Sequence, residues 1–171
     1  MITFKHIRAI LALPFMVLIV IPSILLYYSD FVIFSYQLSV FLEVVFKITG
    51  GLFLLLGLVF LIGNIVTFAK IGNGTLAPWD PPTKLVVTGM YRYVRNPMIT
   101  GVMFILIAES LLTLSLYISC WAVLFIFGSV VLIPIIEEPQ LEKRFGDDYR
   151  LYKRHVPRWI PRWTAWEQNI K

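Results

Sequence analysis

Charged residues are scarce in this sequence. Asp, Glu, Lys and Arg make up 15% of its 171 residues, whereas hydrophobic residues make up 58%. An ordinary soluble domain carries about 25% charged residues, so a soluble globular domain is excluded. A mean hydropathy of +0.80 indicates a protein of the lipid bilayer. Four hydrophobic spans of about 20 residues each would leave too little chain for a separate soluble catalytic domain.

Cysteine and histidine are also scarce, and this limits the possible chemistry. Cys120 is the only cysteine, so the chain forms no intrachain disulfide, and we interpret Cys120 as a small apolar packing residue. The only histidines are His6 and His155, which lie in separate segments without ligand spacing. We therefore predict no metal site and no histidine-dependent catalytic triad.

Apolar residues are concentrated in four runs, at about 7–28, 48–69, 99–115 and 116–136. The first run contains Pro14 and Pro22, which membrane helices tolerate better than soluble ones do. We interpret it as a retained anchor rather than a signal peptide, because it is long and no small-residue cleavage site follows it. The last two runs are so close that they form a helical hairpin. The fold prediction is an all-α, polytopic membrane protein with about four transmembrane helices.

The basic residues predict the orientation of these spans. Fourteen of the fifteen Lys and Arg residues lie before the first run, between the second and third, or after the fourth, which leaves Lys47 alone on the other side. Positive charge favours the cytoplasmic side, so we expect both termini and the loop at 70–97 to be cytoplasmic. Topology and contact with anionic membrane lipids then explain the net charge of +5, and no nucleic-acid partner is expected.

Two cytoplasmic segments carry the candidate functional residues. The loop contains Gly72 and Gly74 in a Gly-x-Gly pattern, which fits a plain connector as well as a cofactor-binding turn. The fourth run ends in Glu137 and Glu138, just after a helix kink expected at Pro134. Adjacent helix positions point about 100° apart, so one carboxylate is expected to turn inward, unless both simply mark the membrane boundary.

The tail continues with an amphipathic pattern that is interrupted at Gly146. One helical face carries Leu141, Phe145, Tyr149, Tyr152 and Val156. This pattern fits a lid over a pocket and a passive surface helix equally well. Glu109, inside the third run, is either protonated and hydrogen-bonded between helices or part of a substrate site, with Lys47 as one conceivable partner.

Together these segments resemble the isoprenylcysteine carboxyl methyltransferases and the similar phospholipid N-methyltransferases. The resemblance covers residues 72–161 of a single domain at 1–171. The first matching stretch begins at Leu85-Val86 and continues as Gly89-Met90-Tyr91-Arg92-Tyr93-Val94-Arg95-Asn96-Pro97-Met98-Ile99-Thr100-Gly101. The second is Glu137-Glu138-x-x-Leu141-x-x-x-Phe145-Gly146-x-x-Tyr149-x-x-Tyr152-x-x-x-Val156-Pro157.

The resemblance implies an enzyme that uses S-adenosylmethionine, bound at the cytoplasmic side between these two stretches. By resemblance, the cofactor pocket is lined by Thr83, Lys84, Leu85, Val86, Tyr91, Asn96, Pro97, Met98, Ile99, Glu137 and Glu138. Glu137 or Glu138 would accept hydrogen bonds from the cofactor's ammonium or ribose, and Arg95 would hold its carboxylate or an anionic substrate group. Arg95 and Glu137 are the predicted catalytic residues.

Departures from the family pattern concern the methyl acceptor. Asn96 stands in place of the family histidine, Ile99 in place of a tyrosine, and Ile133 where eukaryotic carboxyl methyltransferases carry an arginine. We expect a lipophilic small molecule or lipid-modified acceptor, either isoprenylcysteine carboxylate-like or a lipid amine or thiol. The alternatives are an NADPH-dependent membrane reductase, because sterol reductases share a similar C-terminal signature, and an inactive membrane factor.

Overall fold

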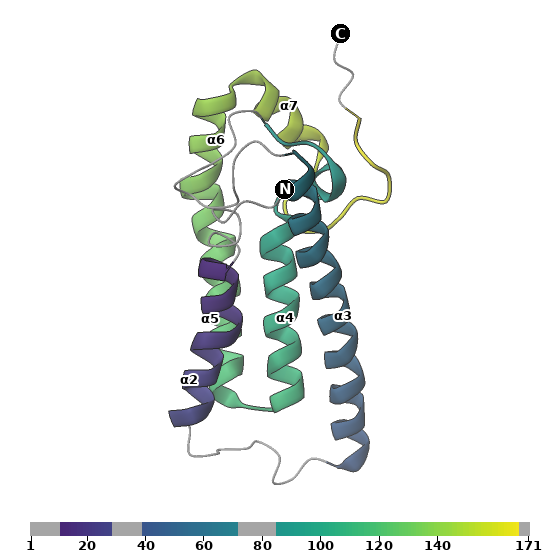
Figure 1. Ribbon diagram of the computed structural model, residues 1–171, viewed down its shortest axis with the longest axis vertical. Coiled ribbons are helices and arrows are strands. Elements are labelled where there is room, and N and C mark those ends of the chain that lie inside the picture. The colour runs from purple at the N-terminus through teal and green to yellow at the C-terminus, as the bar shows by residue number, and fades with distance from the viewer. Residues whose placement is uncertain (1–10, 29–38, 72–84, 168–171) are drawn as a thin grey trace.

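The computed structural model describes residues 11–28, 39–71 and 85–167, with the side chains of 11–13 and 68–71 left out. All regular structure in these ranges is helical. In chain order the elements are η1 (Leu11–Val20), α2 (Ile21–Tyr28), α3 (Val40–Ile71), η3 (Gly89–Arg92), α4 (Pro97–Thr113), α5 (Leu116–Leu132), η4 (Ile133–Glu137), α6 (Glu138–Phe145) and α7 (Asp147–His155). Figure 1 shows α4 between α3 on one side and α2 with α5 on the other.

Two helical stretches are long and apolar enough to cross a membrane, Val40–Thr67 and Leu116–Phe145. Two shorter apolar helices, Pro14–Tyr28 and Pro97–Thr113, pack beside them. With 32 residues, α3 is about 48 Å long, and it begins eight residues before the predicted span. The 17 residues of α4 reach only about 25 Å, less than the roughly 30 Å of a hydrocarbon core. The all-helical prediction is confirmed for the described residues, and the count of four spans stays a prediction.

Helices α3 and α4 are antiparallel and are in close contact at two glycines, Gly57 and Gly101. A Cβ added at Gly57 would lie 2.9 Å from the carbonyl oxygen of Gly101 and 2.5 Å from Cγ1 of Ile105. A Cβ added at Gly101 would lie 2.9 Å from Cβ of Phe60. Any side chain at these positions would therefore force the helices apart, as expected where small residues let membrane helices approach. This contact fixes the position of α4 along the axis of α3, and therefore also the position of the residues at the N-terminus of α4.

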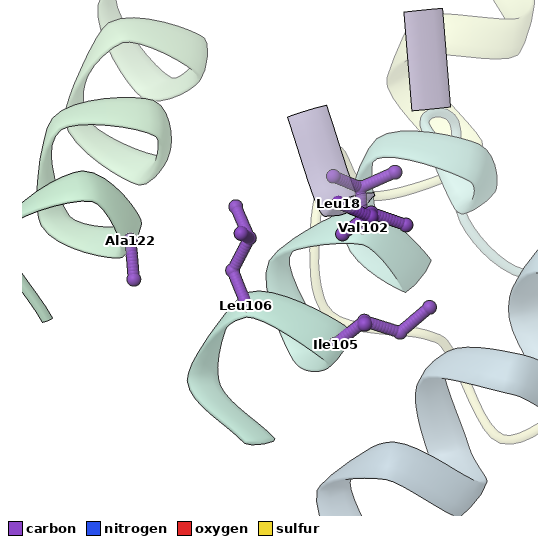
Figure 2. Close-up of a cluster of buried hydrophobic side chains, with 5 residues drawn as sticks. All are labelled: Leu18, Val102, Ile105, Leu106 and Ala122. Atoms are coloured by element: carbon purple, nitrogen blue, oxygen red, sulfur yellow. The ribbon is translucent and has the colours of Figure 1, made fainter. Parts of the chain in front are cut away.

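The first helical stretch packs on the other side of α4. Leu18 belongs to one buried cluster with Val102, Ile105, Leu106 and Ala122 (Figure 2). In a π-helix, the carbonyl of Val17 would accept from the amide five residues later, but that residue is Pro22, which has no N–H. The indole Nε1 of Trp121 donates to this carbonyl instead, at 3.1 Å. The bond ties the first stretch to α5.

The helix continues beyond α5 into α6, and the chain then turns at Gly146. At Pro134, where the sequence predicts a kink, the structure has a π-helical segment, η4, in which the amide of Glu138 donates to the carbonyl of Ile133. The expected interruption at Gly146 separates α6 from α7, because this glycine has a positive φ of 57°. As a result, α7 turns back over the end of the bundle where α4 begins, whereas α6 continues from α5 (Figure 1).

Candidate functional site

The C-terminal tail is tied to the segment before α4 by backbone hydrogen bonds. The amide of Arg95 donates to the carbonyl of Pro157 at 2.9 Å, and the amide of Arg162 donates to that of Tyr93 at 3.0 Å. The amide of Trp166 donates to the carbonyl of Arg92, also at 2.9 Å. Residues 62 to 74 positions apart thus form one structure, in which the tail fixes the backbone conformation around Arg95.

The Arg92 side chain strengthens this connection at the end of the tail. Its Nε donates to the carbonyl of Trp166 at 3.0 Å, and its Nη2 donates to Glu167 at 2.6 Å. The Trp166 ring stacks on the His155 ring with 5.4 Å between centroids. The segment after α7 is therefore anchored by both polar and aromatic contacts.

An aromatic cluster lies between α7 and this tail. Tyr149, Tyr152, Val156 and Trp166 are buried there, and Leu85, Val87, Leu141 and Phe145 pack against them. The five residues that the sequence places on one helical face thus pack together despite the break at Gly146. The hydroxyl of Tyr152 donates to the carbonyl of Tyr91 at 2.7 Å, which joins the cluster to η3.

Burial keeps the tyrosine hydroxyls of this region protonated. It raises the pKa of Tyr149 to about 12, and the negative charge of Glu138 adds to the effect. Burial also raises the pKa of Tyr91 above its ordinary value, with a further contribution from the charge of Glu137. These hydroxyls are therefore neutral hydrogen-bonding groups at physiological pH, and Tyr91 lies within the electrostatic reach of Glu137.

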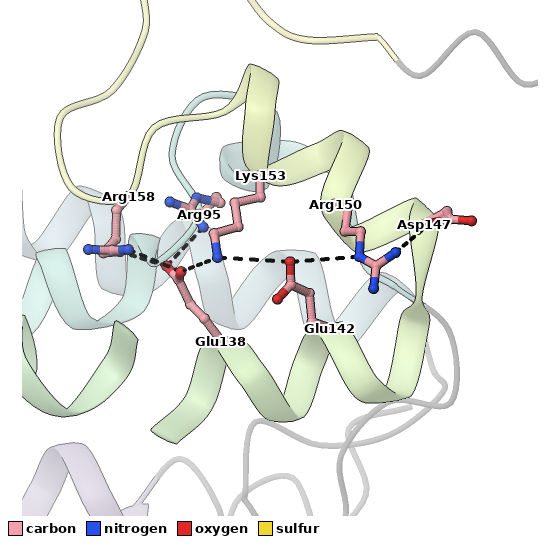
Figure 3. Close-up of polar contacts among 7 residues, drawn as sticks. All are labelled: Arg95, Glu138, Glu142, Asp147, Arg150, Lys153 and Arg158. Atoms are coloured by element: carbon pink, nitrogen blue, oxygen red, sulfur yellow. Dashed lines mark hydrogen bonds and ion pairs between the residues drawn. The ribbon is translucent and has the colours of Figure 1, made fainter. Parts of the chain in front are cut away.

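Glu138 is the centre of an ion-pair cluster (Figure 3). Only 2% of its side chain is exposed, and its Oε1 accepts from Nη1 of Arg95 at 2.8 Å and from Nε of Arg158 at 2.6 Å. Its Oε2 accepts from Nη2 of Arg158 at 3.0 Å and pairs with Nζ of Lys153 at 3.1 Å. These hydrogen bonds raise the pKa of the Arg158 guanidinium. One buried carboxylate of α6 therefore joins the segment before α4, α7 and the tail.

The cluster carries more positive than negative charge. Arg95, Lys153 and Arg158 all contact the single carboxylate of Glu138, and the next acid, Glu142, is 4.0 Å from Lys153. The Arg95 side chain is 8% exposed, and its Nε is a buried donor without a partner among the described residues. A donor of this kind is ready to bind an anion.

Glu137 differs from its neighbour in exposure and in its contacts. It is exposed, and within the described ranges no hydrogen bond or ion pair to its carboxylate is found. The sequence expectation that the two acids face different directions is thus met by one buried and one exposed carboxylate. An exposed carboxylate is hydrogen-bonded to water, which a ligand can displace. Of the two acids, Glu137 is therefore the one that a ligand can reach.

The structure brings most of the sequence-predicted residues to this end of the bundle. Asn96 precedes α4, Pro97 is buried at its first position, and Met98 and Ile99 are half-buried in its first turn. Leu85 packs on the aromatic cluster, and Val86 beside it is half-buried. Thr83, Lys84 and the glycines of the Gly-x-Gly pattern lie outside the described residues.

Two partners of the cluster are not recognisable from the sequence. Lys153 and Arg158 follow Glu138 by 15 and 20 residues, across the turn at Gly146, so no helical spacing relates them. In the sequence, the predicted membrane topology already explains their positive charges. These two residues can be recognised as partners of Glu138 only from the folded structure of the tail.

Glu109 lies apart from this cluster. It is half-buried near the C-terminus of α4, and its Oε2 has no partner among the described residues. Its conceivable partner Lys47 pairs instead with Glu43 on the next turn of α3, at 2.6 Å. In the described part of the chain, no group of three or more His, Cys, Asp or Glu side chains is placed to hold a metal ion.

Comparison with known proteins identifies one family. A sequence model described as phospholipid methyltransferase matches residues 45–148, more than half of the chain. The match extends from the beginning of α3 to the first residues of α7, so it includes the α3–α4 contact and both glutamates. Neither a curated protein nor a solved structure shows significant similarity to the chain.

Proposed function

Because the chain belongs to the phospholipid methyltransferase family, which confirms the resemblance seen in its motifs, we propose that it is an integral-membrane methyltransferase that uses S-adenosylmethionine. Its acceptor is a lipophilic molecule, either isoprenylcysteine carboxylate-like or a lipid amine or thiol. Residues 1–171 form a single multi-pass domain with its family-like core at 72–161. Both termini and the active site face the cytoplasm.

The observation that carries this proposal is the contrast between Glu137 and the cationic cluster beside it. The amino-acid end of S-adenosylmethionine has an ammonium and a carboxylate. Among the described residues, Glu137 offers an exposed carboxylate without a partner, and Arg95 offers a buried Nε donor without a partner. These two groups match the two charges of the ligand, so Glu137 would hold the ammonium and Arg95 the carboxylate.

Glu138 then acts on the cofactor through Arg95. All its hydrogen-bonding capacity is directed to Arg95, Lys153 and Arg158, so it positions these cations rather than contacting the ligand itself. A bound carboxylate would also reduce the excess positive charge of the cluster, which favours binding of the zwitterionic cofactor. The adjacent glutamates of the motif thus have different tasks.

The remaining residues complete the site. Tyr91, Asn96, Pro97, Met98 and Ile99 come from η3 and the first turn of α4, and they supply hydrogen-bonding groups and apolar walls for ribose and adenine. Leu85 and Val86 would also line the site, and the resemblance adds Thr83 and Lys84, which lie outside the described residues. When bound, the cofactor supplies an electrophilic methyl group. The protein's contribution is to align the acceptor with that methyl group and to exclude water.

Calorimetry on the purified protein in detergent tests this proposal. We expect the protein to bind S-adenosylmethionine and Glu137→Gln to weaken binding about tenfold or more, since a hydrogen bond to a charged group contributes about 1.5 to 3 kcal/mol. Glu142→Gln is the matched control, because it removes a nearby acid of α6 outside the proposed site. A wild-type protein that binds NADPH and no S-adenosylmethionine would reverse the assignment in favour of a reductase.

A labelled-methyl transfer assay identifies the acceptor. The protein is incubated with methyl-labelled S-adenosylmethionine and a total membrane-lipid extract, and mass spectrometry identifies the labelled products. Methylation of a lipid amine, thiol or carboxylate supports the enzyme and names its substrate class. Cofactor binding without label in any lipid, thiol or amine acceptor would favour an inactive membrane factor.

A further inference from the structure

Asn64 is a fully buried polar residue in the half of α3 nearest to the candidate site. Its side chain has 0% exposure. The amide Nδ2 donates to the carbonyl of Phe60, one turn earlier, at 2.8 Å. The amide oxygen Oδ1 has no hydrogen-bond partner among the described residues. Native proteins leave few buried acceptors without a donor, so this oxygen requires an explanation.

The packing of α3 places Asn64 opposite the beginning of α4. Gly57 faces Gly101 and Ile105 of α4, and seven residues later the helix has completed almost two turns, so Asn64 lies on the same face. Because the two helices are antiparallel, this position lies about 10 Å from the Gly57 contact toward the N-terminus of α4. It is therefore level with the segment before and at Pro97.

Two further contacts support this placement. Next to Asn64, a Cβ added at Gly63 would lie 2.9 Å from the side chain of Met90 in η3. One turn farther along, a Cβ added at Gly89 would lie 2.6 Å from Oγ1 of Thr67. Both contacts join this part of α3 to the segment from Gly89 to Pro97, which carries Tyr91, Arg95 and Asn96 of the proposed site.

Helix packing alone does not account for the free oxygen. Thr67 and Thr100 are polar residues of the same helix pair, and each donates its hydroxyl to the carbonyl four residues earlier, at 2.7 and 2.9 Å. Neither leaves a buried atom unpartnered. Asn64 makes the same kind of bond through Nδ2 and still carries a second, unused polar atom that is costly to bury.

We propose that Oδ1 of Asn64 accepts a hydrogen bond from an N–H or O–H group of a ligand bound in this site, which makes α3 a third wall of the pocket. The inference rests on the proposed function. Two ligands offer such donors, because S-adenosylmethionine has ammonium, amino and hydroxyl groups and an amine acceptor has N–H groups. Asn64 would thus complement Arg95, since one supplies a buried acceptor and the other a buried donor.

The variants Asn64→Leu, Asn64→Asp and Thr67→Val test this proposal in the full-length protein. Leucine has nearly the same size and lacks the acceptor, whereas aspartate keeps it. Thr67→Val is the matched control, because it removes a hydrogen-bonding side chain one turn away that is already satisfied. Thermal unfolding without ligand, calorimetric titration with S-adenosylmethionine, and the KM for the methylated lipid at saturating cofactor are measured for each.

We expect Asn64→Leu to keep or raise the ligand-free melting temperature, because it removes a buried acceptor without a donor. The same variant should weaken the binding of one of the two ligands, S-adenosylmethionine or the lipid acceptor, about tenfold. A larger Kd for S-adenosylmethionine identifies the cofactor as the donor, and a larger KM for the lipid with unchanged cofactor Kd identifies the acceptor. Asn64→Asp should retain more of the affinity, and Thr67→Val all of it.

The outcomes separate this inference from the proposed function. A wild-type protein that fails to bind S-adenosylmethionine contradicts the proposed function itself. If the wild type binds and Asn64→Leu lowers the melting temperature without changing either Kd or KM, Asn64 has a purely structural role and the inference is wrong.

Discussion

At Glu138, three positive charges meet one carboxylate that water barely reaches. A buried ion pair gains little over well-packed apolar residues, but removal of one partner leaves the other charge buried and unpaired. Arg95, with a side chain only 8% exposed, is the charge that would suffer most. Replacing Glu138 alone, with its cationic partners left in place, should therefore cause a large loss of stability.

We predict that Glu138→Ala destabilises the protein by about 3 kcal/mol, in the range measured for broken buried pairs. Thermal unfolding in detergent, followed by tryptophan fluorescence, measures this loss. Glu142→Ala is the control, because this acid is one turn further along α6 and its contacts with Arg150 and Lys153 are 4.0 Å long and partly exposed. Its removal should cost less than about 1 kcal/mol. Equal effects of the two variants would show that the cluster does not hold the tail.

For the adjacent residue, Glu137, we predict the opposite: an effect on ligand binding and none on the stability of the ligand-free protein. Because Glu137 is exposed and makes no hydrogen bond or ion pair within the described ranges, Glu137→Gln should change the free energy of unfolding of the ligand-free protein by no more than about 0.5 kcal/mol. The stabilisation produced by added S-adenosylmethionine should shrink, since bound ligand stabilises in proportion to its affinity. A fall in the ligand-free melting temperature would contradict this separation of roles.

Among the helices, the contact between α3 and α4 determines where the site residues stand. At Gly57, the backbone carbonyl of Gly101 lies within van der Waals distance of any added side chain, and a backbone cannot move aside as a flexible side chain can. Displacement of α4 would move Asn96, Pro97 and Met98 away from the tail. Packing outside the proposed site therefore determines the geometry of that site.

We predict that Gly57→Leu destabilises the protein by about 3 kcal/mol, at the upper end of the usual cost of overpacking, and weakens S-adenosylmethionine binding as well. Gly51→Leu is the control in the same helix, because a Cβ at Gly51 has no neighbour within 4 Å. That variant should be neutral or slightly stabilising, since leucine favours a helix more than glycine does. Thermal unfolding and calorimetry on both variants provide the comparison, and equal behaviour would contradict the close contact.

How much of this could be predicted differs between the elements and the site. Apolar runs locate the helices, and Gly146 and Pro134 mark the breaks, because these are local properties of the chain. The eight additional residues of α3 before the predicted span were missed, because Glu43 and Lys47 interrupt the apolar run there and pair with each other on the helix surface. The spacing of Leu141, Phe145, Tyr149, Tyr152 and Val156 predicted their common face.

The partners within the site could not be predicted in the same way. Arg95 and Arg158 reach Glu138 from positions 43 and 20 residues away, and only the folded tail brings them together. The sequence predicts that the carboxylates of Glu137 and Glu138 point in different directions. Which of the two is buried depends on the π-helical turn at η4. Asn64 gave no signal in the sequence, since an asparagine in an apolar run is noticed only when its oxygen is found without a partner.

For the whole molecule, charge distinguishes the two ends of the bundle. Lys47 lies one turn from Gly50, whose added Cβ would contact Leu111 and Leu112 near the end of α4. The basic residues Arg92, Arg95, Lys153 and Arg158 lie at the opposite end, with the candidate site. The uneven distribution of charge along the sequence is thus also an uneven distribution in space, and it predicts that the site end faces the cytoplasm.

Cysteine labelling in intact cells measures this orientation. In a Cys120→Ala background, which removes the only native cysteine, a cysteine is introduced either at Thr113 or at Asp148, both exposed and at opposite ends of the bundle. A membrane-impermeant maleimide should label the variant Thr113→Cys directly. The variant Asp148→Cys should react only after the cells are permeabilised, because positive charges are retained on the cytoplasmic side. The reverse pattern would place the site outside the cytoplasm, where S-adenosylmethionine made inside the cell could not reach it without transport.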